Sequence, residues 1–77
     1  MVKYTFGTHE LEFDEELVQT FEKEVPDIFE ECIECYLRTT LKCSSIETIF
    51  NSYTKEQLQQ VVINAAKQEI ALYKGEI

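Results

Sequence analysis

VKYTFGTHELEF, residues 2–13, alternates apolar and polar side chains on both sides of the pair Gly7-Thr8. A period of two is typical of strands with one buried face. A glycine at the first position of a two-residue turn favours a type II′ hairpin. In that register Lys3 lies opposite Glu12 as a cross-strand pair of opposite charge. The apolar face of the predicted hairpin contains the pairs Val2–Phe13, Tyr4–Leu11 and Phe6–His9.

The rest of the chain predicts helices that cover this hairpin. A hairpin alone is marginally stable in water, so its aromatic face has to pack against another element. Apolar side chains at helical spacing predict helices over residues 15–24, 26–42, 45–50 and 55–74. The fold class is therefore α+β, a small single domain over residues 1–77 with an N-terminal β-hairpin followed by three to four helices. A chain of this length buries only a small core.

Capping residues indicate where these helices begin and end. Asp14 is a predicted N-cap, and Pro26 is expected to end the first helix and to occupy the first turn of the second. Ile28 is expected on the apolar arc of that second helix. The other predicted end signals are two capping boxes and one C-terminal stop, namely Ser44 with Glu47, Thr54 with Gln57, and Gly75.

Acidic residues dominate the charge of the chain. Fifteen Asp and Glu residues against seven Lys and Arg residues give a formal net charge of −8. Eleven of the acids lie between residues 10 and 34, where Lys23 is the single basic residue. Because phosphate groups attract Lys and Arg, this balance argues against direct binding to nucleic acid or to an anionic membrane. We expect a cytoplasmic protein, because the sequence has no apolar run of membrane-spanning length and no signal-peptide pattern.

The acidic segment is the main functional signal. Helical spacing of Asp27, Glu30, Glu31 and Glu34 predicts one stripe of carboxylates, with neighbours ~5–6 Å apart, broadly comparable to the phosphates of a nucleic-acid strand. A solvated face whose acids complement helix dipoles is the plainer interpretation of the same residues. Glu34 and Arg38 are also spaced for a helical ion pair. The acids expected to bind a partner are Glu12, Asp14, Glu15, Glu16, Glu22, Glu24, Asp27, Glu30, Glu31 and Glu34.

In size, in charge and in its lack of catalytic motifs, the chain resembles the small acidic proteins that phages and mobile elements make to block host nucleic-acid machinery. This resemblance implies a non-enzymatic inhibitor that mimics DNA. Its partner is then a protein with a basic surface that normally binds nucleic acid. The sequence contains no glycine-rich phosphate loop and no HExxH or GxSxG motif. We therefore expect no cofactor.

An apolar face on the last predicted helix is the alternative functional signal. Val61, Ala65 and Leu72 belong to an apolar arc that covers more than a third of the helix circumference. Glu69 lies near the middle of that arc, where an interface edge with a Lys or Tyr partner suits it better than a dry core. The alternative is thus a structural or regulatory interaction module that forms a homodimer, or binds its partner, through these four residues.

The cysteines offer a third interpretation. Cys32 and Cys35, together with Cys43 and His9, have the composition of a Cys3His zinc site. Both Cys32 and Cys35 fall inside a predicted helix, however, and 100° per residue places all three cysteines on one helix face, where free cysteines are often core residues. We therefore expect structural cysteines, a histidine that is on the surface or packs on the hairpin, and no metal.

Overall fold

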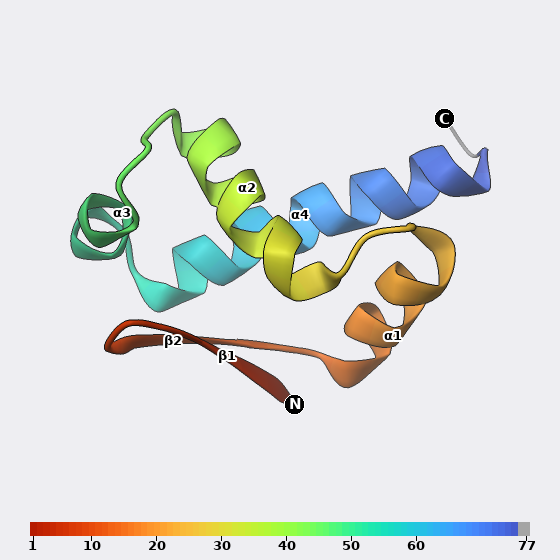
Figure 1. The fold of residues 1–77 in the computed structure, drawn as a ribbon, viewed down its shortest axis with the longest axis horizontal. Helices are drawn as coiled ribbons and strands as arrows, with labels where there is room; N and C mark the ends of the chain where they lie inside the picture. Colours follow the sequence, from red (N-terminus) through yellow and green to blue (C-terminus); the bar gives the residue numbers. More distant parts are fainter. Residues whose placement is uncertain (76–77) are drawn as a thin grey trace.

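A computed structural model describes residues 1–75, and within them an antiparallel hairpin is followed by four helices (Figure 1). This confirms the predicted α+β class. The elements are β1 (Val2–Phe6), β2 (His9–Phe13), α1 (Glu15–Glu24), α2 (Phe29–Leu41), α3 (Ile46–Ser52) and α4 (Lys55–Lys74).

The hairpin has the predicted register. Val2 lies opposite Phe13, and Lys3 lies opposite Glu12. Gly7, the first turn residue, has a φ of 65°, whereas Thr8, the second, does not have a positive φ. Positive φ at the first turn residue alone is the backbone of a type II′ turn, which matches the right-handed twist of the strands.

Helix α4 is the element on which the others pack. Figure 1 shows α2 crossing α4, with α3 and the turn of the hairpin toward one side of the view and α1 toward the other, and contacts join α4 to β2, α1 and α2. The largest fully buried side chains come from every element except β1. They are Leu11, Phe13, Phe21, Phe29, Ile33, Leu37, Ile49, Leu58 and Val62.

Phe29 is the centre of an aromatic cluster that joins the hairpin to α1 and α2. Its ring meets those of Phe13 and Phe21 edge-on, with centroids 5.1 and 5.2 Å away. The ring of Tyr4 lies 5.7 Å from Phe29. Edge-on aromatic pairs add attraction beyond the area they bury. The aromatic face of the hairpin is therefore covered by the start of α2, as the marginal stability of a lone hairpin requires.

Helix α2 begins later than the sequence predicts, at Phe29 and not at Pro26. Val25 before the proline is extended, with φ −105° and ψ 131°, as residues before proline usually are. Ile28 is also extended and is the N-cap, without a side-chain cap. In its place the carboxylate of Glu22 accepts a hydrogen bond of 3.2 Å from the backbone N–H of Phe29. Pro26 thus lies in the connection between α1 and α2, and the N-terminus of α2 is capped by a side chain of α1.

The ends of α1 and α4 are as predicted. The Asp14 carboxylate accepts from the backbone N–H of Glu16 at 3.0 Å. At the start of α4, the Thr54 hydroxyl accepts from Gln57 N at 3.1 Å, and Gln57 Oε1 accepts from Thr54 N at 2.9 Å. Gly75 follows α4 in the left-handed conformation with φ 77°. These signals act over three residues or fewer, so the local sequence specifies them fully.

The predicted capping box at the start of α3 is wrong. Ser45, and not Ser44, is the N-cap, and its hydroxyl accepts from the backbone N–H of Thr48 at 3.3 Å. The chain leaves α2 through Lys42 in the left-handed conformation, with φ 53°. The connection therefore extends one residue further than expected, and Glu47 lies in the first turn of α3 without a capping role.

Candidate functional site

The acids of the segment 10–34 do not form a single array. Three of them, at the start of α1, are separated from Glu22, the next acid of that helix, by six residues, about 9 Å along its axis. Two others are held in ion pairs. Glu10 lies apart from the others on β2, and the remaining five lie at the end of α1, in the α1–α2 connection and in the first turn of α2. We call this group the acidic corner, and it consists of Glu22, Glu24, Asp27, Glu30 and Glu31.

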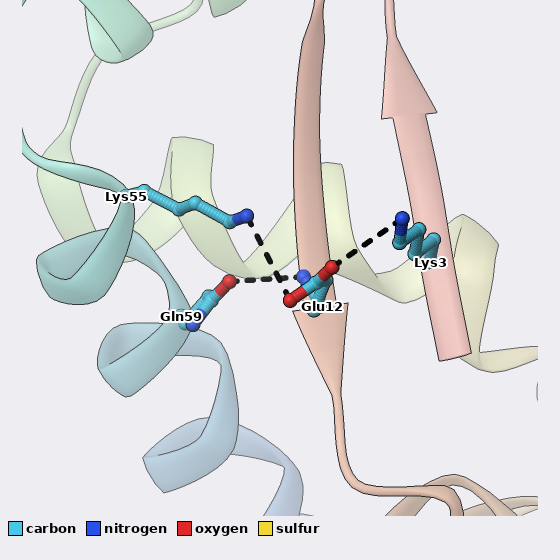
Figure 2. Close-up of polar contacts among 4 residues, drawn as sticks. All are labelled: Lys3, Glu12, Lys55 and Gln59. Atoms are coloured by element: carbon cyan, nitrogen blue, oxygen red, sulfur yellow. Dashed lines mark hydrogen bonds and ion pairs between the residues drawn. The ribbon is translucent and has the colours of Figure 1, made fainter. Parts of the chain in front are cut away.

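Glu12 ties the hairpin to α4 (Figure 2). Its carboxylate lies 3.7 Å from the ammonium group of Lys3 on β1 and 3.8 Å from that of Lys55 on α4. Its backbone N–H donates to Gln59 Oε1 at 2.9 Å, which satisfies a donor on the outer edge of β2. Because two lysines compensate its charge, Glu12 stabilises the contact between the hairpin and α4 and does not belong to the candidate binding surface.

The expected four-carboxylate stripe on α2 is incomplete. Asp27 precedes the helix, in the connection after α1. Glu34 forms the predicted i,i+4 ion pair with Arg38, at 3.5 Å. The Arg38 guanidinium also donates to the Ser44 carbonyl at 3.1 Å. Only Glu30 and Glu31 of the expected stripe are therefore exposed, helical and free of an ion pair within residues 1–75.

Acids from α1 and α2 converge on one place at the corner. Burial raises the pKa of the Tyr4 hydroxyl, and the negative charges of Glu22 and Glu30 raise it further. Glu22 belongs to α1 and Glu30 to α2, yet both are close enough to β1 to act on the same hydroxyl. Within residues 1–75, none of the five corner carboxylates has an ion pair with a Lys or Arg.

An exposed isoleucine lies within this corner. Ile28 is 57% exposed, and it lines a shallow hollow of about 530 Å³ together with Glu22, Val25, Pro26 and Asp27. The prediction that it belongs to the apolar arc of a helix is wrong, because the late start of α2 turns it outward. An N-cap usually carries Ser, Thr, Asp or Asn, and a large aliphatic side chain is usually buried. The sequence contained this residue, but helical periodicity assigned it to the core.

A second hollow lies between α2 and α4 and has a volume of about 380 Å³. Of the four residues predicted as a dimer face, Ala65, Glu69 and Leu72 line it, whereas Val61 packs against the core. Leu72 is 50% exposed. The α2–α4 groove, as we call it, is lined by Cys35, Tyr36, Thr39, Thr40, Ala65, Gln68, Glu69 and Leu72.

Glu69 has only uncharged protein groups close to it in this groove. Burial raises the pKa of the Tyr36 hydroxyl, and negative charge at Cys32 and Glu69 raises it further. Glu69 also contributes to the raised pKa of Cys32, for which burial and Asp27 are larger causes. The expected tyrosine neighbour of Glu69 is thus present, but no cation pairs with it within residues 1–75.

The cysteines have three different environments. Cys32 is half-buried, Cys35 is exposed, and Cys43 lies beyond the end of α2 with its Sγ 3.7 Å from the Ser45 carbonyl oxygen. The expectation of three core cysteines on one helix face is therefore wrong for Cys35, which is exposed. Cys43 packs against the core as Cys32 does, but it lies beyond α2 and not on that helix face. The raised pKa of Cys32 means that its thiol stays protonated at neutral pH.

His9 and the cysteines do not form the alternative zinc site in the described part of the chain. The His9 ring stacks on Phe50 of α3, with centroids 4.5 Å apart and planes 4° from parallel. Residues 1–75 contain no group of three or more His, Cys, Asp or Glu side chains placed to hold a metal ion. Of the two roles expected for His9, on the surface or packed at the hairpin, the structure shows the packed one.

Comparisons with protein-family models, with curated proteins and with solved structures found no match to this chain. Among the helices of residues 1–75, none combines the length and the apolar character needed to cross a membrane.

Proposed function

We propose that the protein is a non-enzymatic inhibitor that binds a basic, nucleic-acid-binding surface of a target protein through its acidic corner. The observation that carries this proposal is the exposed Ile28, set in a hollow with two carboxylates, that of Glu22 on α1 and that of Asp27 in the α1–α2 connection. An apolar centre within a charged rim is the common anatomy of a protein-binding surface.

The two parts of the corner have different physical tasks. Carboxylates without ion pairs act at a distance, because complementary charge speeds the encounter between partners. Ile28 acts on contact, because burying an aliphatic side chain slows dissociation. A basic groove that normally holds DNA or RNA offers positive charge to the rim of the corner. The enrichment of acids beyond what helix capping uses supports a partner of this kind.

The same proposal places the protein in the cytoplasm, in the reducing compartment where nucleic-acid machinery works. Its three cysteines are unpaired, with no disulfide among them in residues 1–75. Reducing compartments keep thiols in this state.

Neutralising two corner acids tests the electrostatic part of the proposal. In E30Q/E31Q, we expect capture of the target from a lysate of the source organism to fall about tenfold at about 0.05 M salt. The loss should shrink toward wild-type behaviour at about 0.5 M salt, where exposed charges are screened. Quantitative mass spectrometry of the captured proteins measures both effects.

E47Q/E56Q is the matched control for this experiment. Glu47 and Glu56 are exposed first-turn acids of α3 and α4, as Glu30 and Glu31 are of α2. Both double variants change the net charge equally and remove similar interactions with helix dipoles. Equal loss of capture in the two variants would show a general charge effect and would contradict a role for the corner.

A further inference from the structure

We propose that the α2–α4 groove is a second docking site, which takes a segment of a partner protein carrying a Lys or Arg beside aliphatic side chains. None of the groove residues belongs to the acidic corner, so binding there does not depend on the function proposed above. The occupant is defined by two features of the lining, one apolar and one charged.

The apolar feature is an open helix face. Leu72 is half exposed on α4, and Ala65 lies two turns before it on the same face of the groove. The small side chain of Ala65 leaves room there for an incoming aliphatic group. The volume of about 380 Å³ falls within the range of sites that hold side chains or small ligands.

The charged feature is Glu69, a half-buried carboxylate without a cationic partner in the described residues. Its neighbours one turn away on α4 are Ala65, Ala66, Leu72 and Tyr73, and none of them is basic. The groups on α2 whose pKa values its charge raises are the Tyr36 hydroxyl and the Cys32 thiol. A carboxylate in a partly apolar groove gains most from a Lys or Arg that enters with the ligand.

A second copy of this chain fits the groove poorly. In a symmetric dimer whose axis passes through the groove, the same patch meets itself, and the two Glu69 side chains would lie close together. Two molecules that each carry a net charge of −8 also repel one another. Charge complementarity therefore favours a basic, amphipathic segment of another protein, bound as a helix is bound in an apolar groove.

The test uses a fluorescein-labelled amphipathic peptide of leucine and lysine, about 15 residues long. Fluorescence anisotropy at about 0.3 M salt measures its affinity, because screening then suppresses binding by charge alone. We expect E69Q and L72S each to weaken binding about fivefold or more. In amide NMR spectra, the peptide should shift the signals of Ala65, Glu69 and Leu72. A peptide with glutamate in place of lysine should not bind.

E56Q and E30Q/E31Q are the controls, and both should keep the wild-type affinity within about twofold. E56Q removes one exposed carboxylate from the same helix, outside the groove. If E30Q/E31Q weakens peptide binding as much as E69Q does, the peptide binds the acidic corner and the groove proposal fails. If sedimentation shows a dimer that L72S dissociates, the groove is a self-interface, and the proposal is likewise overturned.

Discussion

Phe29→Ala is expected to lower the free energy of unfolding by about 3–5 kcal/mol, the usual range for removing a fully buried phenylalanine. The ring of Phe29 is completely buried and meets rings from both strands and from α1. A domain this small has only a few kcal/mol of net stability, so the variant should be largely unfolded at room temperature. Urea denaturation followed by circular dichroism measures the change.

Phe50→Ala provides a control with the same change in side chain. Phe50 is half-buried, and its ring meets those of Phe6 and His9 at the turn end of the hairpin. We expect a cost of about 1–2 kcal/mol for this variant, since less apolar area leaves the core. Equal costs at the two positions would contradict the central place of Phe29 in the fold.

Ile28→Ser is expected to separate binding from stability. A serine at the N-cap of α2 can accept a hydrogen bond from the first turn, which should raise the free energy of unfolding by about 1 kcal/mol. Loss of the aliphatic side chain from the centre of the acidic corner should weaken target binding by about tenfold or more. Thermal melting gives the first quantity, and surface plasmon resonance with the captured target gives the second.

Tyr73→Ser is the matched control for Ile28→Ser. Tyr73 is 52% exposed, close to the 57% of Ile28, but it lies on the last turn of α4 and does not line the hollow around Ile28. It should leave target binding within about twofold of wild type. The account of the corner would be contradicted if Ile28→Ser bound the target normally, whatever its stability.

Elements specified by neighbouring residues could be predicted from the sequence. The register of the hairpin follows from a period of two and one turn glycine, and the bounds of α4 follow from Thr54, Gln57 and Gly75. The start of α2 could not be predicted in this way. Its N-terminus is capped by Glu22, a residue of the preceding helix, and this contact exists only once α1 and α2 are packed.

The candidate site was predictable only as a composition. The sequence indicates many acids between residues 10 and 34, but it does not show which of them are neutralised. Glu12 is paired with Lys55, which lies far along the chain, so tertiary structure alone removes it from the surface. The exposure of Ile28 could not be predicted for a related reason, because its outward position depends on where α2 begins.

The most direct measurement of the central claim is competition between this protein and nucleic acid for the captured target. A fluorescent DNA or RNA duplex bound to the purified target is titrated with the protein at constant ionic strength. The account predicts complete release of the duplex, at a protein concentration that rises in proportion to the duplex present, and weaker release by E30Q/E31Q. A ternary complex, in which the duplex stays bound while the protein binds the target, would contradict it.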